Sequence, residues 1–285
     1  MSSSAIVAAQ TLIAQNIILY GGAIILVLGV LGGCLNTIVF TSLRTFRENS
    51  CAYYLLIMSI VNIGQLLTGL LSRIMISGFA IDWTLASLFY CKFRYFIFQL
   101  STLLSFTSLC LATIDQYFAT CSILRWQQWS NIKYSHRLIG LFLIIWLLHG
   151  IPFLFFYSHA KLPTTDIIFC TSMNSVFFKF YSNGFVLILS GLLPVLITGV
   201  FGFLAYHNVR NIAYRTVPLV RRELDKQLTV MVLTQVICNC FSIIPYITVN
   251  TIASSYSSTI NPNVIGIVQI IAAVTICLYY IFFAV

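Results

Sequence analysis

The stretch that decides the fold runs from Cys91 to Tyr117 and reads CKFRYFIFQLSTLLSFTSLCLATIDQY. It begins with a cysteine, ends with an Asp-Gln-Tyr triplet, and holds no charged residue between Phe96 and Ile114. An α-helix of this length, at ~1.5 Å per residue, is about 39 Å long. That exceeds the ~30 Å hydrocarbon core of a bilayer. We therefore expect a membrane-spanning helix with Cys91 at one membrane face and Asp115 at the other.

The composition of the whole chain excludes an ordinary soluble domain. Of its 285 residues, 60% are hydrophobic and only 7% are charged, whereas soluble domains carry about 25% charged residues. The net charge of +9 comes from basic residues scattered between apolar segments. Because they form no single basic stripe, the chain is not expected to bind nucleic acid. Its expected environment is the lipid bilayer.

Seven apolar segments are each long enough to span a membrane. We therefore predict an all-α fold, an integral membrane bundle of seven transmembrane helices. The chain is expected to form a single membrane domain over residues 1–285. The predicted spans run roughly over residues 17–43, 52–78, 89–119, 137–157, 179–206, 227–252 and 263–285.

The distribution of Lys and Arg orients these segments. Ten of the 15 basic residues fall in the loops 44–51, 120–137 and 207–226, and five fall on the opposite side or its flanks. An excess of Lys and Arg marks cytoplasmic loops. We therefore expect an extracellular N-terminus, an extracellular Cys91 and a cytoplasmic Asp115.

Two cysteines differ from the others because they lie at a span end or in a loop. Cys91 begins the third span, and Cys170 lies in the loop over residues 158–178. Both are expected on the extracellular side, where a disulfide persists, and the loop is long enough to reach the top of the third span. We expect a Cys91–Cys170 bridge that holds this loop across the mouth of the bundle. Two unpaired loop thiols are the alternative.

Asp115 lies at the cytoplasmic end of its helix, where the helix dipole favours cations over anions. Its carboxylate is therefore expected to have a partner, with Arg125 and the basic residues of 221–226 as candidates. A solvated interfacial aspartate is the alternative.

Three spans contain an internal proline, at Pro152, Pro194 and Pro245. Each proline removes an intrahelical hydrogen bond and bends its helix. Bent helices can enclose a cavity, although membrane helices also tolerate prolines that have no such role. Polar residues inside spans, including Asn36 and Asn62, favour hydrogen bonds between helices. Helix packing is the simpler interpretation for each of them taken singly.

No motif for catalysis is present. No span contains two carboxylates, no His-x-x-x-His pair occurs, and the four histidines lie on different segments. We therefore expect no enzymatic activity, no bound metal and no cofactor. Ionisable residues are nearly absent from span interiors, which disfavours pumps and transporters.

Taken together, these features resemble the rhodopsin-like (class A) family of G-protein-coupled receptors. Asn62 in LLIMSIVN falls where the family usually has a second-span aspartate. Cys91 lies 25 residues before Gln116, which matches the family's spacing from its third-span cysteine to the arginine of an Asp-Arg-Tyr triplet. The other matching positions are Asn36 in GGCLN, Trp83 before the third span, Trp146 in the fourth, Cys170 in the second extracellular loop, and Pro194 and Pro245 in the fifth and sixth spans.

Several positions depart from the family pattern. Gln116 replaces the arginine of the triplet, which removes the charged contacts of that arginine. Asn62 replaces the aspartate that, with Ser105, would form the family's sodium site. Ile243 and Asn239 stand where the sixth span usually has tryptophan and phenylalanine. The seventh span has no Asn-Pro-x-x-Tyr motif before the chain stops, which favours a divergent, C-terminally truncated member.

The resemblance narrows the ligand by elimination. Amine receptors of the family carry an aspartate seven residues after the third-span cysteine, where this chain has Phe98. Opsins bind retinal through a seventh-span lysine, and no lysine follows Lys226. A peptide is therefore favoured over an amine or retinal. Phe98, Gln99 and Thr102 are the candidate ligand-binding residues on the cavity side of span three, with ordinary bundle packing as the alternative.

The resemblance implies a multi-pass plasma-membrane receptor that binds an extracellular ligand and signals to a heterotrimeric G protein. Asp115, Gln116 and Tyr117 are the expected G-protein contacts. The expected core polar and hinge positions are Asn36, Asn62, Ser105, Trp146, Pro194 and Pro245. A receptor-fold protein that no longer signals, such as a scaffold or an incomplete receptor, is the alternative, followed by a transporter or channel.

Overall fold

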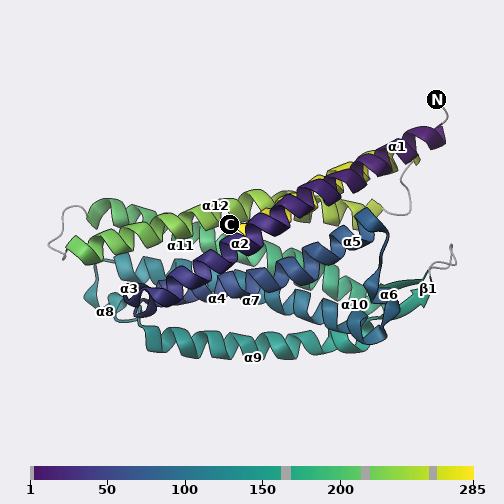
Figure 1. Cartoon of the computed structure of the whole chain (residues 1–285). Coiled ribbons are helices and arrows are strands. Elements are labelled where there is room, and N and C mark those ends of the chain that lie inside the picture. Colours follow the sequence, from purple (N-terminus) through teal and green to yellow (C-terminus); the bar gives the residue numbers. More distant parts are fainter. Residues whose placement is uncertain (1–2, 162–167, 213–218, 257–261) are drawn as a thin grey trace.

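The computed structural model describes residues 3–161, 168–212, 219–256 and 262–285, which form an elongated helical bundle (Figure 1). Within these residues, seven helices are long and apolar enough to cross a membrane. They are α1–η1–α2 (Ser3–Asn16, Ile17–Gly21, Gly22–Ser42), α4–η2–α5 (Ser50–Gln65, Leu66–Leu70, Leu71–Phe79), α7 (Leu88–Thr120), α9 (Ile132–Phe156), α10–η3–α11 (Ser175–Lys179, Phe180–Leu192, Leu193–Ile212), α12 (Leu219–Tyr256) and α13 (Pro262–Ala284). The η segments are π-helical, and the short helices α3 (Arg44–Arg47), α6 (Trp83–Ala86) and α8 (Leu124–Gln127) lie between spans.

The first helix is longer than expected. The sequence predicted a start near residue 17, but α1 begins at Ser3 and continues without a break into η1 and α2. Its sequence has no charge and several alanines, which favour helix. Ala14 and Ile18 are buried against Ala273 of α13, so packing on the last helix stabilises the additional turns.

The central element is α7. In its most apolar 18-residue window, 67% of residues are buried, against 17% for α9. Phe106 and Leu109 of α7 are buried in one core cluster with Leu228 of α12 and Phe282 of α13. Since α7 contacts most of the other spans, the polar or apolar side chains on each of its faces line the inside of the bundle. Most of α9, by contrast, is exposed at the periphery.

The prolines affect the helices in two ways. Pro152 and Pro245 lie inside α9 and α12. Pro194 instead follows the π-helical segment η3, where the wider turn accommodates a residue that has no N–H to donate. The Ser190 hydroxyl donates a 2.7 Å hydrogen bond to the carbonyl oxygen of Phe185 within this segment. It thereby satisfies an acceptor in the part of the helix with irregular backbone bonding.

The loop after α9 contains a β-hairpin, which the all-α prediction missed. Strands β1 (Ser158–Lys161) and β2 (Ile168–Thr171) pair antiparallel, with His159 opposite Cys170. The loop holds no strong strand pattern over this short length, so the hairpin depends on tertiary contacts. One of these is the His159 side chain, whose Nε2 lies 2.7 Å from the carbonyl oxygen of Thr84 in α6.

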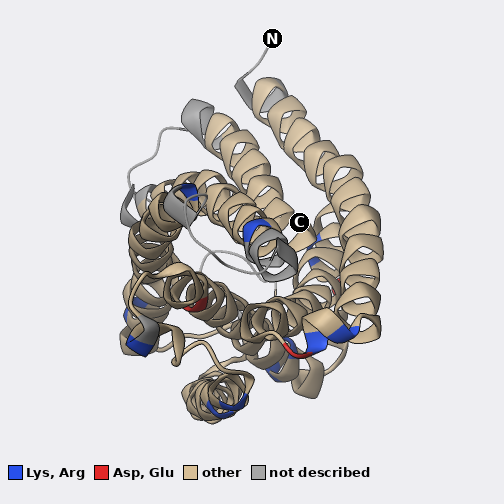
Figure 2. Cartoon of the chain, turned by 90° about the vertical axis from the view of Figure 1, so that its left-hand side faces the viewer, with Lys and Arg blue, Asp and Glu red and all other residues tan. Residues whose placement is uncertain are grey.

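The two ends of the bundle differ. We call the end with the hairpin, Cys91 and Cys170 the disulfide end, and the end with α3 and α8 the Asp115 end. In Figure 1 the Asp115 end is on the left and the hairpin is on the right. Figure 2 looks onto the Asp115 end and shows basic positions on helices around its rim.

Candidate functional site

A disulfide fixes the hairpin to the central helix. Cys91 in the first turn of α7 is bonded to Cys170 in β2, with their Cα atoms 5.8 Å apart. Cys91 is fully buried. The Ser87 hydroxyl accepts a hydrogen bond from the Tyr90 N–H and so caps α7 just before the cysteine. The bridge therefore joins β2 to a well-formed helix end, as the sequence predicted.

A cavity of about 290 Å³ lies at this end of the bundle. Phe169 and Cys170 of β2 form part of its wall, together with residues of α5, α7, η3, α12 and α13. Aromatic side chains dominate the wall, and the tyrosines among them are Tyr95, Tyr181, Tyr246, Tyr279 and Tyr280. The Tyr246 and Tyr279 rings are stacked with their centroids 4.5 Å apart, so α12 and α13 are in contact at the cavity.

Three charged residues also line this cavity: Arg73, Asp82 and Arg94. Asp82 caps α6, because its carboxylate accepts hydrogen bonds from the backbone N–H of Thr84 at 2.9 Å and from the Thr84 hydroxyl. Arg94 donates its Nε–H to the carbonyl oxygen of Thr68 at 3.2 Å. Its guanidinium carbon lies 5.5 Å from the centre of the Tyr95 ring. The carboxylate is thus held by α6, and one arginine is anchored between two helices.

The three predicted ligand-binding residues occupy different environments. Phe98 lines the cavity. Gln99 is fully buried toward α9, where its Nε2 lies 3.4 Å from the carbonyl oxygen of Trp146. Thr102 is also fully buried and donates to the carbonyl oxygen of Phe98 at 2.8 Å. The structure therefore places Phe98 on the cavity wall and Gln99 in a helix–helix contact, because a one-residue step along α7 turns the side chain by about 100°.

The Asp115 end contains a cluster of buried polar side chains. Asp115 is 6% exposed and accepts hydrogen bonds from the hydroxyls of Ser50 at 2.7 Å and Ser130 at 3.1 Å. These serines were not among the partners expected from the sequence, which were basic residues; the side chains of residues 221 and 222 lie outside those that the structure describes. The Gln116 amide donates to the Thr229 hydroxyl of α12.

Tyr117, the third residue of the triplet, lies in an aromatic group. Its ring centroid is 5.6 Å from that of Phe201 in α11 and 6.2 Å from that of Trp126 in α8. It therefore connects α7 to the fifth span and to the loop after α7. The triplet as a whole therefore contacts four neighbouring elements: α4, α8, α11 and α12.

Comparison with known proteins decides the family. The family model described as "7 transmembrane receptor (rhodopsin family)" matches residues 35–282, most of the chain. The chain belongs to the rhodopsin family of seven-transmembrane receptors. This confirms the resemblance found in the sequence and makes the chain a multi-pass membrane protein. A search of curated proteins gave no match.

In this receptor, two of the family-type polar positions form a buried pair. The Ser105 hydroxyl of α7 donates to Asn62 Oδ1 of α4 at 2.6 Å. Both residues are buried. An amide has no formal charge, so this pair joins α4 to α7 through a neutral hydrogen bond. Trp146 makes a second family-type contact, because its indole N–H donates to the Thr107 hydroxyl of α7 at 3.0 Å.

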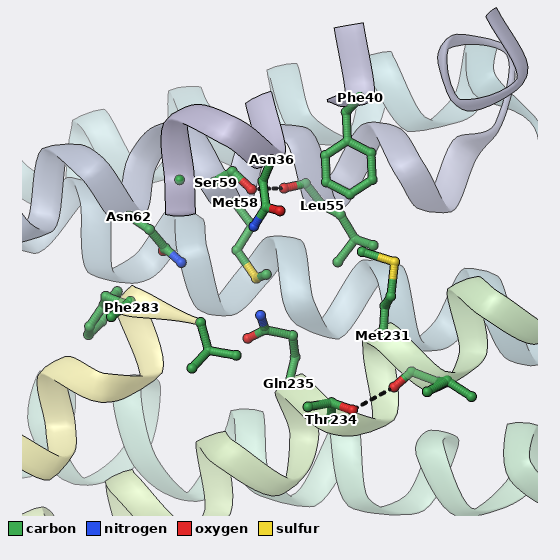
Figure 3. Close-up of a pocket in the computed structure, with 14 residues that line it drawn as sticks. Asn36, Phe40, Leu55, Met58, Ser59, Asn62, Met231, Thr234, Gln235 and Phe283 are labelled. Carbon is green, nitrogen blue, oxygen red and sulfur yellow. Dashed lines mark hydrogen bonds between the residues drawn. The ribbon is translucent and has the colours of Figure 1, made fainter. Parts of the chain in front are cut away.

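A second cavity, of about 220 Å³, lies next to Asn62 in the half of the receptor toward the Asp115 end. Figure 3 shows that Asn36 and Asn62 approach it from α2 and α4, while Gln235 approaches it from α12 on the opposite side. Met58 and Phe283 add apolar wall. The wall of this cavity thus comes from four different spans, and the cavity lies between α12 on one side and α2 and α4 on the other.

The sixth-span departures are both buried in the receptor core. Ile243 is 1% exposed and lies in the main core cluster. Asn239 is fully buried, and within the described residues neither its Nδ2 nor its Oδ1 has a hydrogen-bond partner. An unpaired buried amide costs roughly 1–3 kcal/mol. This amide therefore lowers the stability of the packing around α12.

The sequence interpretation missed the polar residues of the larger cavity. Arg73 and Arg94 are two of the five basic residues outside the loops expected to be cytoplasmic. The tyrosines of α12 and α13 were not singled out. Because Lys and Arg are concentrated on the other side of the predicted membrane, two arginines on this side were a signal that could have identified them. Among the residues that the structure describes, no three His, Cys, Asp or Glu side chains gather as a metal site.

Proposed function

We propose that this receptor is a G-protein-coupled receptor of the plasma membrane with a peptide as its extracellular ligand. The observation that carries the proposal is the cavity at the disulfide end, walled by Phe98 of α7 and by the bridged strand β2. A cavity of about 290 Å³ is close to the lower limit of ligand sites, about 300 Å³. It would take one or two residues of a peptide, with the rest lying over the hairpin.

The proposed orientation has the N-terminus and the disulfide end outside the cell. It is supported by the excess of Lys and Arg in the loops of the Asp115 end and by the disulfide, because disulfides persist in oxidising compartments. An epitope placed before Ser3 should be labelled by antibody on intact cells. An epitope inserted after Arg210 should be labelled only after permeabilisation. The reverse pattern would contradict this orientation.

The proposed G-protein contact is the Asp115 end. Ligand binding would favour a state in which α11 and α12 move apart from α7 there. The buried contact of Gln116 with Thr229 is the interaction that such a movement has to break. We expect a library of peptides to include at least one that raises guanine-nucleotide exchange on a co-expressed G protein. A broad library without any active peptide would count against the proposal.

The alternative is a receptor-fold protein that does not signal. Gln116 favours it, because the neutral side chain there is buried by its contact with α12 and cannot make the charged contacts of an arginine. Replacing Gln116 by arginine distinguishes a receptor that signals from a receptor-fold protein that does not. Basal nucleotide exchange that appears only in the Q116R variant would support a protein that has lost coupling. Exchange already present in the unmodified chain would support a working receptor. Substrate flux in reconstituted vesicles would instead indicate a transporter or channel.

A further inference from the structure

The cavity at the disulfide end has an unusual charge for a site surrounded by membrane-spanning helices. Arg73 of α5 and Arg94 of α7 both line it, and Asp82 is the only acidic residue on its described wall. Two positive groups against one negative group leave one net positive charge. Arg94 is half-buried, whereas Arg73 is exposed at its span end. Ionisable side chains at membrane depth usually pair with an opposite charge. The cavity is therefore suited to an anion.

Asp82 does not neutralise the two arginines. Its carboxylate is held by the N–H and the hydroxyl of Thr84 at the start of α6. The Arg44–Glu48 pair is the only salt bridge within the described residues, so neither Arg73 nor Arg94 is paired with an acid there. Arg94 uses its Nε–H on the Thr68 carbonyl. A guanidinium has five N–H donors, so most of its donors can still serve a ligand.

The remaining wall supplies hydrogen-bond donors and apolar surface. Five tyrosines line the cavity, and a tyrosine hydroxyl that reaches a bound anion can donate to it. Phe98, Phe169 and Ile276 add apolar area. This combination suits a group that has a carboxylate at one end and an aromatic or aliphatic body at the other. It does not suit an amine, which the arginines would repel.

We infer that this cavity binds a carboxylate, with Arg73 and Arg94 as its cationic partners. The inference rests on the proposed function, because it defines the chemistry of the same ligand site. Arginine binds carboxylates through paired N–H donors, which makes the contact strong and directional. The small cavity volume limits the bound group to a small organic acid or to the C-terminal residue of a peptide with a free carboxyl group.

Binding to the purified full chain in nanodiscs tests the inference without a G protein. One panel contains phenylacetate, 3-(4-hydroxyphenyl)propionate and indole-3-acetate, each compared with its amide. The second contains hexapeptides with an aromatic C-terminal residue, each with a free and with an amidated C-terminus. We expect acids to raise the melting temperature and the matched amides to leave it unchanged. Stabilisation by the first panel would identify a small acid, and stabilisation by the second alone a peptide terminus.

Variants then locate the contact. R73Q and R94Q should each weaken acid binding about tenfold or more, because charge-assisted hydrogen bonds are the strongest in proteins. Lys92 and Lys179 carry the same charge at the same end but do not line the cavity, so K92Q and K179Q should bind like the unmodified chain. R94K keeps the positive charge and is the control for a loss of binding that comes only from misfolding of R94Q. It should bind more tightly than R94Q.

Three outcomes would overturn the inference. They are equal stabilisation by acids and amides, absence of stabilisation by both panels, and acid binding that R73Q and R94Q leave intact. Acid binding that needs both arginines but never changes nucleotide exchange would support the inference while contradicting the proposed signalling. Nucleotide exchange in response to a neutral peptide, without any acid binding, would support the proposed signalling and contradict the inference about the carboxylate.

Discussion

The side-chain amide of Gln116 on α7 donates a hydrogen bond to the hydroxyl of Thr229 on α12. Gln116 is 1% exposed and Thr229 is 2% exposed, so water does not compete for this bond. The position of Gln116 is one where the family carries an arginine. In this receptor, a neutral contact therefore joins the two helices whose separation we propose for signalling.

We expect the Thr229→Val variant to raise basal guanine-nucleotide exchange about three- to fivefold. Valine preserves the shape of threonine but cannot accept the bond, and a hydrogen bond between membrane helices contributes ~0.6–1 kcal/mol. Thr234→Val is the matched control, because the Thr234 hydroxyl donates to the Val230 carbonyl of its own helix at 2.9 Å. Equal effects of the two substitutions would show that the contact with Gln116 does not hold the end closed.

Loss of the disulfide should destabilise the receptor. A cross-link between Cys91 and Cys170, which are 79 residues apart in the sequence, contributes roughly 2–5 kcal/mol to the stability of a folded domain. We expect Cys91→Ala to lower the melting temperature in detergent, and the double variant with Cys170→Ala to behave like the single one. Cys34 is a free, exposed cysteine, so Cys34→Ala should melt like the unmodified chain. A melting temperature unchanged by Cys91→Ala would contradict a stabilising bridge.

A methyl group at Gly150 should disturb the contact between α7 and α9. A Cβ atom there would lie 2.5 Å from Phe96 Cε2 and 2.8 Å from Gln99 Oε1. Overpacking of this kind costs about 1–3 kcal/mol, so Gly150→Ala should lower the melting temperature. Gly140 lies on the same helix with no atom within 4 Å of a built Cβ. Gly140→Ala should therefore be neutral or slightly stabilising, and similar losses in both variants would refute the close approach.

The two serines beside Asp115 should contribute to stability. Hydrogen bonds to charged groups are worth about 1.5–3 kcal/mol, and Ser50 and Ser130 both donate to this carboxylate. We expect Ser50→Ala to lower the melting temperature more than Ser175→Ala, which removes an exposed hydroxyl at the start of α10. In a double-mutant cycle with Asp115→Asn, the two losses should not add. Strict additivity would show that the two side chains act independently.

Much of the fold could be predicted because membrane spans have a strong sequence signal. The uncharged run between Phe96 and Ile114 predicted the helix that the structure shows as α7, and the loop cysteine predicted the bridge to Cys91. The hairpin β1–β2 was missed, since a four-residue strand has little signal of its own. The early start of the first helix was missed because it depends on packing against α13, a helix more than 200 residues away in the sequence.

The candidate ligand site was only partly predictable. Phe98 lies on the cavity wall, at an offset from Cys91 that could be compared with the family. Gln99 contacts α9 instead, because the boundary between the cavity face and the α9 face of α7 depends on how the helices pack. Arg73 and Arg94 belong to different spans, and nothing local in the sequence indicates that their side chains line one cavity.

The sequence by itself determined that this protein is a helical membrane protein, because hydrophobic length and charge placement act along the chain. Its motifs indicated the receptor family, which the family model confirms. It also predicted one long helix from Cys91 to Tyr117, with a cysteine at one end and the Asp-Gln-Tyr triplet at the other. Only the tertiary structure decided what meets those ends: two arginines and five tyrosines at one, two serines and Thr229 at the other. Most of these residues come from other spans, so the packing of the helices decides which of them lie at each end of α7.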